Sequence, residues 1–165
     1  TDVVMSFPYF MVILVFVSVL GPSTLNVILV LGLLGWPDIA RLIRGSILSA
    51  KNTDYVRAAV ALGLPHTRIA VFHIMPNIIA PVLVNATFGV SNAILMESAL
   101  SFLGMGVQPP LASWGNMLTD AQSLTILSSK PWLWLPPGIM ILVTVLAINF
   151  VGDGLRDALD PKKVR

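Results

Sequence analysis

The chain has 165 residues, of which 56% are apolar and only 11% carry a charge, with a formal net charge of +2. A water-soluble domain has about 25% charged residues, so this composition excludes a water-exposed globule and indicates a protein that lies in a lipid bilayer. The absence of cysteine excludes disulfides, thiolate metal sites and thiol catalysis, and so apolar a chain is a poor candidate for binding nucleic acid.

The first part of the chain predicts two membrane spans. No charged side chain occurs between Asp2 and Asp38, and a Gly-Pro-Ser sequence at 21–23 divides this stretch into two apolar runs. A helix needs roughly 20 residues to cross about 30 Å of hydrocarbon. We therefore predict antiparallel spans over about residues 3–20 and 24–43, joined by a tight turn.

Two further charge-free runs predict a third span over about 76–96 and a fourth over about 132–152. The fourth begins with Trp132 and Trp134, aromatic residues that suit a membrane interface. The stretch between these spans is rich in Gly, Pro, Ser and Asn, which is typical of an irregular loop. The predicted fold is therefore all-α, a polytopic transmembrane helical bundle.

The basic residues predict which ends of the spans face the cytoplasm. Nine of the ten fall in the connection between the second and third spans or near the C-terminus; they are Arg41, Arg44, Lys51, Arg57, Arg68, Arg156, Lys162, Lys163 and Arg165. The positive-inside rule then places both chain ends in the cytoplasm. We expect one transmembrane domain over 1–161, with a cytoplasmic loop at about 44–75, an extracytoplasmic loop at about 97–131 and a cytoplasmic tail at 162–165.

A short helix is predicted within the cytoplasmic loop. Asn52 or Thr53 can cap its start, Asp54 lies in the first turn where the helix dipole favours a carboxylate, and Gly63 followed by Pro65 ends it. A helix this short does not hold itself in water, so it needs a surface to dock on.

One face of this helix is predicted to make that contact. Tyr55, Ala58, Ala59 and Leu62 recur at helical spacing and form an apolar face with small residues at its centre. Small residues let another surface come close. The docking surface is either a partner protein or the chain's own helix ends and the lipid headgroups, and the spacing alone leaves both open.

Several phrases of the sequence resemble one protein family. Ala58-Ala59, then Gly63, then Met75-Pro76 resembles the EAA loop of permease subunits of binding-protein-dependent ABC importers. The phrases SFLGMGVQPP (101–110), SWGNML (113–118) and NFVGDGLRDALDP (149–161) are similar to the dipeptide, oligopeptide and nickel branch of that family. The resemblance runs from Phe7 to Pro161 and implies the last four of the family's six spans.

The resemblance implies a permease subunit in the plasma membrane of a bacterium or archaeon, for peptides, dipeptides or nickel-type substrates. The implied partners are a second permease subunit, cytoplasmic ATP-binding subunits and an extracytoplasmic solute-binding protein, with no cofactor. The loop helix would couple to the ATPase through Asp54, Tyr55, Arg57, Ala58, Ala59, Gly63 and Pro76. Arg57 stands at the motif's glutamate position, which reverses the charge expected there.

The chain is not expected to be an enzyme. Its glycines form no G-x-x-x-x-G-K-[ST] phosphate cradle, so no catalytic residue is expected and ATP hydrolysis belongs to a partner subunit. His66 and His73 form no H-E-x-x-H pattern, so no metal site is expected. A self-contained channel or secondary transporter would need ionisable groups at mid-span, and none is expected there. A non-functional truncated permease fragment is the remaining alternative.

Two further sets of residues are candidates for the transport path and its outer mouth. Asn85, Gly89 and Asn92 fall within about 40° of one another on the third span, and form either a wall of the path or an interhelical packing seam. In the outer loop, the resemblance implies that Gln108 and Trp114 dock the binding protein. The alternative for that loop is a cap that folds back on the membrane domain.

Overall fold

The computed structural model describes residues 1–159, so the predicted tail at 162–165 lies outside the described residues. Within residues 1–159 every regular element is helical, which confirms the all-α prediction. The elements are α1 (Asp2–Met5), α2 (Tyr9–Leu20), α3 (Thr24–Leu34), α4 (Trp36–Ala50), α5 (Asp54–Ala61), α6 (His66–Ile69), the π-helix η1 (Ala70–Ile74), α7 (Met75–Phe102), α8 (Trp114–Met117), the 3₁₀-helix η2 (Leu118–Gln122), α9 (Leu124–Ser129) and α10 (Pro131–Leu159).

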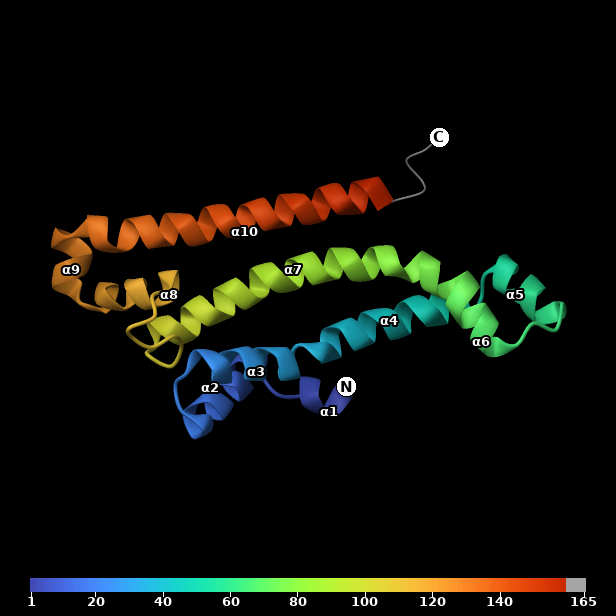
Figure 1. The fold of residues 1–165 in the computed structure, drawn as a ribbon, viewed down its shortest axis with the longest axis horizontal. Coiled ribbons are helices and arrows are strands. Elements are labelled where there is room, and N and C mark those ends of the chain that lie inside the picture. The colour runs from blue at the N-terminus through green and yellow to red at the C-terminus, as the bar shows by residue number, and fades with distance from the viewer. Residues whose placement is uncertain (160–165) are drawn as a thin grey trace.

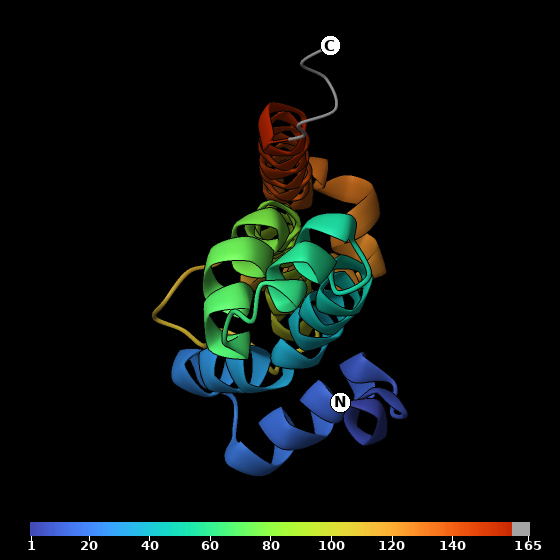
Figure 2. The same ribbon diagram turned by 90° about the vertical axis from the view of Figure 1, so that its right-hand side faces the viewer.

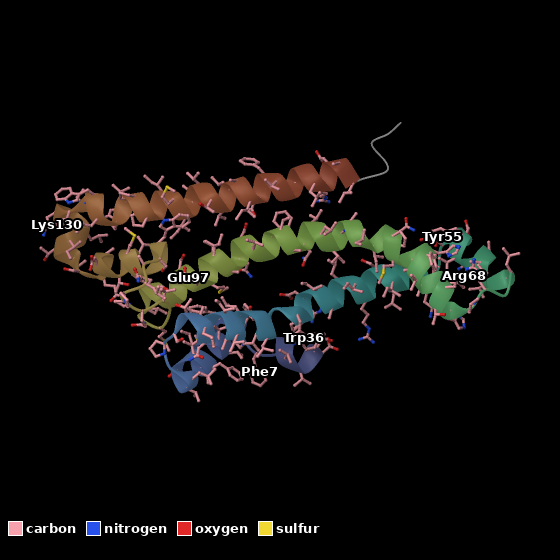
Figure 3. All side chains as sticks on the ribbon, viewed as in Figure 1. Phe7, Trp36, Tyr55, Arg68, Glu97 and Lys130 are labelled. Atoms are coloured by element: carbon pink, nitrogen blue, oxygen red, sulfur yellow. The ribbon has the colours of Figure 1, made fainter. Side chains whose placement is uncertain are left out.

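The long helices run along the longest axis of the molecule, with α7 between α4 and α10 (Figure 1). The view along this axis keeps the same order, with α10 on one side of α7 and the α2–α3 pair on the other (Figure 2). Helices α5 and α6 lie at one end of the long helices, together with the end of α10, whereas α8 and α9 lie at the opposite end. The side chains follow the same division, since Tyr55 and Arg68 lie at the first end and Lys130 lies at the second (Figure 3).

Three helical stretches of residues 1–159 are long and apolar enough to cross a membrane: Thr24–Ala50, His66–Phe102 and Pro131–Leu159. The prediction of the first of the four spans therefore needs a correction. Residues 3–20 do not form one helix, because α1 ends at Met5 and α2 begins only after Pro8. A proline disfavours helical backbone in the residue before it. The 12 residues of α2 measure about 18 Å, less than a hydrocarbon core of about 30 Å.

The other predicted spans are parts of longer helical stretches. The predicted span 24–43 is divided between α3 and α4 and continues to Ala50. The helix that contains 76–96 continues to Phe102, and the one that contains 132–152 continues to Leu159. Charged residues do not end a helix, because the backbone hydrogen bonds continue through them, so the edge of an apolar run underestimates the helix. As a result, Glu97 lies on α7 rather than in the outer loop.

Buried apolar side chains gather in two separate clusters. The hairpin cluster joins α2 and α3 to the end of α7 and consists of Ile13, Val17, Val27, Val30 and Leu100. The loop cluster lies at the other end and consists of Ala50, Val56, Ala59, Ile69, Ile74 and Ile78. Within the three membrane-length stretches, only 11–17% of the most apolar window is buried inside the chain. The remaining apolar surface is exposed on the chain, as expected of a multi-pass membrane protein.

Helices α7 and α10 pack most closely where Gly152 meets Thr87. A Cβ on Gly152 would lie 2.4 Å from Thr87 Oγ1, so the contact has no room for a side chain. About one turn along each helix, the Ser91 hydroxyl donates to Asn149 Oδ1 at 2.9 Å. Small residues and a polar pair of this kind are typical of helix contacts within membranes.

Replacing Gly152 by alanine is expected to destabilise the protein, because the added methyl overpacks the contact with Thr87 at a cost of about 1–3 kcal/mol. The matched control is Gly154→Ala on the same helix, where a Cβ meets no atom within 4 Å. This control is expected to gain up to about 1 kcal/mol from helix propensity. Thermal unfolding in detergent measures both, and equal melting temperatures for the two variants would contradict the proposed overpacking.

Candidate functional site

The loop helix α5 has well-defined ends. Thr53 is its N-cap residue, but the hydroxyl donates to the Ala50 carbonyl at 2.6 Å rather than capping the helix. At the other end, Gly63 has a φ of +72°, the left-handed conformation that favours glycine. The amide of Gly63 donates to the Val60 carbonyl and that of Leu64 to the Ala59 carbonyl, which together form a Schellman motif. Gly63 is therefore required for the shape of the loop.

The face of α5 that meets the rest of the chain differs from the predicted face. Val56 and Ala59 are 3% and 4% exposed and belong to the loop cluster, whereas Leu62 is 79% exposed. The predicted contact face is therefore divided: Ala59 is covered by the chain's own residues, whereas Leu62 is open. The reason is that α6, η1 and α7 supply the apolar surface on which Val56 and Ala59 dock.

The opposite face of α5 is open. Asp54, Arg57, Ala58 and Ala61 are all exposed, and they follow one another at helical spacing. The two alanines lie beside the two charges and form a small-residue surface that a second protein can approach closely. Ala61 was missed in the sequence, although its position three residues after Ala58 is the signal that would have identified it.

Two other loop residues connect α5 with α7. The Asn77 amide donates to the Tyr55 hydroxyl at 3.3 Å and to the His73 carbonyl at 2.7 Å. Asn77 was not predicted from the sequence, because the contact joins residues 22 positions apart. Pro76, by contrast, lies in the first turn of α7 and is exposed.

An open cavity of about 1410 Å³ lies beside α4 and α7. The predicted stripe Asn85, Gly89 and Asn92 lines it, and Tyr55 and Asn77 contribute at the loop end. On α7 this stripe points away from Ser91, which meets α10. The stripe therefore lines this cavity and does not form the packing seam with α10.

Charged residues also line this cavity, which corrects the expectation of no ionisable group at mid-span. Asp38 and Arg41 belong to the wall, and because the helix continues to Ala50 both lie well inside the stretch Thr24–Ala50. Arg41 also approaches Asp2, with 3.7 Å between Nη2 and Oδ1. Charged groups are therefore present at mid-span. Their expected absence no longer argues against a secondary transporter.

The outer loop folds back on the end of α7. A Cβ on Gly115 would lie 2.5 Å from Ser98 Cα, so α8 sits directly on α7. The Ser101 hydroxyl donates to Glu97 Oε1 at 2.6 Å and accepts from the Val107 amide at 3.0 Å. Contacts of this kind are expected if the loop is a cap that folds back on the membrane domain, which is the second of the two alternatives for it.

The two predicted docking residues lie inside this cap. Gln108 is half-buried, and its amide donates to the carbonyls of Gly104 at 3.0 Å and Gly106 at 3.3 Å. Trp114 is also half-buried and begins α8. Exposed apolar side chains nearby are instead those of Leu111 and Met117.

Comparison with known proteins identifies the relatives of the chain. The family model described as "Binding-protein-dependent transport system inner membrane component" matches residues 1–165. A putative peptide permease protein of Brucella ovis is 45% identical over 161 residues, which cover 98% of this chain and 53% of the relative. The dipeptide transport system permease protein DppC of Alkalihalophilus pseudofirmus is 42% identical over 161 residues, covering 98% and 52%.

The oligopeptide transport system permease protein OppC of Escherichia coli is likewise 42% identical, over 162 residues that cover 98% of this chain and 53% of the relative. Each of these alignments takes in α5, the cavity-lining part of α7 and α10 together, because it covers nearly all of the chain. The chain spans about half the length of the curated relatives it matches.

Proposed function

Because the chain belongs to the family of inner membrane components of binding-protein-dependent transport systems, we propose that it forms part of the substrate path of an ATP-driven importer. The observation that carries the proposal is the open face of α5, a helix that also contributes Tyr55 to the wall of the cavity beside α7. Through this face the chain receives the movement of a cytoplasmic ATPase. The chain itself performs no covalent chemistry.

The shape of α5 supports an ATP-binding subunit as its partner. One face of its eight residues is anchored in the loop cluster, so the helix is already formed before a partner arrives. Because the helix is preformed, binding of the partner does not include the free-energy cost of ordering it. The open face offers the small side chains of Ala58 and Ala61, with Asp54 and Arg57 beside them to orient the partner surface.

The distribution of basic residues supports an orientation. The end with α5 and α6 carries Lys51, Arg57 and Arg68, and the opposite end carries Lys130. By the positive-inside rule, α5 faces the cytoplasm and α8 and α9 face the outside of a bacterial or archaeal plasma membrane. A solute-binding protein then docks on the outer cap, where Leu111 and Met117 offer exposed apolar surface beside the half-buried Trp114.

Peptides are the substrate class that we propose. The named relatives are peptide, dipeptide and oligopeptide permeases. The cavity wall supports the proposal, because it combines apolar groups and asparagine amides with one acidic and one basic side chain, Asp38 and Arg41. Such a wall suits a zwitterion with varied side chains. A second permease subunit closes the open side of the cavity and covers apolar surface that the chain leaves exposed.

Uptake by the reconstituted importer tests this function. The full-length protein that contains this chain is inserted into liposomes with its ATP-binding subunits, the second permease subunit and the binding protein, and radiolabelled trialanine is supplied outside. We expect uptake when the ATP-binding subunits have ATP and none when they have ADP. Uptake that needs an ion gradient and persists without ATP would instead make the protein a secondary transporter, with Asp38 as its ionisable group.

A further inference from the structure

The contact between Tyr55 and Asn77 is the only side-chain hydrogen bond from α5 to α7 within residues 1–159. The Asn77 amide reaches the Tyr55 hydroxyl at 3.3 Å and at the same time holds the His73 carbonyl at 2.7 Å. One side chain of α7 is thus fixed both to the loop helix and to the preceding π-helix.

The part of α7 that carries Asn77 is weakly joined to its neighbours in the chain. It follows the π-helix η1, a rare wide turn that interrupts the α-helical hydrogen bonding and is frequent at functional sites. It also lies between Pro76 and Pro81, and proline has no N–H to donate. Pro81 in particular leaves the Asn77 carbonyl without its partner in the helix ladder. The segment between the two prolines can therefore change its direction at lower cost than the rest of α7.

This segment leads directly to the cavity wall. Tyr55 and Asn77 line the same cavity as Asn85 and Gly89, and Asn85 lies about one turn beyond Pro81. A rotation of the segment at its inner end therefore changes the direction of the wall.

We propose that the hydrogen bond between Tyr55 and Asn77 is the positioning contact through which movement of α5 reaches the cavity wall. The inference rests on the proposed function, in which α5 binds an ATP-binding subunit. The loop cluster holds α5 on α7, but apolar contacts have no directional preference and permit rotation. A hydrogen bond is directional, so it fixes which way the segment turns when α5 moves.

A cysteine reporter in the cavity tests this proposal. The chain has no cysteine, so Gly89→Cys introduces a single thiol in the wall, with cysteines elsewhere in the full-length protein replaced by serine. In the assembled importer, ATP with vanadate is expected to change the rate at which a membrane-impermeant maleimide labels this thiol. Tyr55→Phe is expected to reduce that change about two- to tenfold, the range for one hydrogen bond, while the ATP-binding subunits still copurify.

Two further variants complete the test. The double variant Tyr55→Phe/Asn77→Ala is expected to show the same reduced change in labelling rate as Asn77→Ala alone. This result is expected when two groups act through one contact. Ser18→Ala removes a hydroxyl from the exposed side of α2 and is expected to leave the response unchanged.

Three outcomes would decide against these assignments. An unchanged labelling response in Tyr55→Phe would overturn the positioning role. Loss of the ATP-binding subunits from Tyr55→Phe would also overturn it, because Tyr55 would then contact the partner directly, and the proposed function would stand. Failure of the proposed function has a separate signature, namely uptake by the importer that needs no ATP, whereas copurification that survives a charge placed at Ala58 would show that α5 is not the contact.

Discussion

Ala58→Asp is expected to abolish copurification of the ATP-binding subunits while leaving the loop folded. Ala58 is exposed at the centre of the open face of α5, so the chain itself accommodates a larger side chain. A partner packed against this small-residue surface does not, because the carboxylate would be desolvated without a counter-charge. A central interface position of this kind contributes about 2 kcal/mol or more, so binding is expected to weaken by more than about tenfold.

Ala59→Asp is the matched comparison, because it makes the same change one residue along the same helix. Ala59 is 4% exposed within the loop cluster, so a carboxylate there is buried and unpaired, and it costs several kcal/mol of loop stability. Limited proteolysis is expected to cut the loop faster in Ala59→Asp and at the wild-type rate in Ala58→Asp. If Ala58→Asp retains its ATP-binding subunits, α5 is not their contact or lies on the other side of the membrane.

Gly89→Trp is expected to reduce peptide uptake to background while the importer still assembles. Gly89 lines the cavity, and a Cβ there would meet no atom within 4 Å, so the indole enters the cavity without displacing the chain. Gly138→Trp is the matched control: this glycine also has open space around it, but it lies on α10 and does not line the cavity. Uptake of radiolabelled trialanine and copurification of the ATP-binding subunits measure both effects. Normal uptake by Gly89→Trp would assign the stripe to packing rather than to the path.

The long helices could be predicted from the sequence because each depends on a local property, the length of an apolar run. Their ends could not be predicted in the same way. The run that ends before Asp38 is followed by helix as far as Ala50, since backbone hydrogen bonding does not depend on side-chain charge. Conversely, the helix is interrupted before Pro8 within the apolar run 3–20, and hydropathy alone does not indicate this interruption.

The orientation of α5 and α7 depends on residues far away in the sequence. On α5, Val56 and Ala59 turn inwards because Ile69, Ile74 and Ile78 form the surface that receives them, and periodicity alone equally allows the face with Tyr55 and Leu62. Helix spacing groups candidate residues correctly, but the neighbouring element decides which group is buried.

Helix α7 shows the same dependence on a distant element. It carries polar or small residues on two opposite sides, the stripe with Asn85 and Gly89 and the side with Thr87 and Ser91. Asn149 and Gly152 of α10 pack against the side with Thr87 and Ser91. The opposite side therefore lines the cavity.

The length of the central helical stretch determines how far the loop reaches from the bilayer. His66–Phe102 has 37 residues and measures about 55 Å along its axis. Even when tilted by about 20° it spans about 50 Å, which exceeds the 40–45 Å of a bilayer with its headgroup layers. In the proposed orientation, the end of this stretch that carries α5 therefore stands clear of the lipid surface. A water-soluble protein can thus bind α5 without entering the headgroup layer, and can move α5 without contacting the lipid.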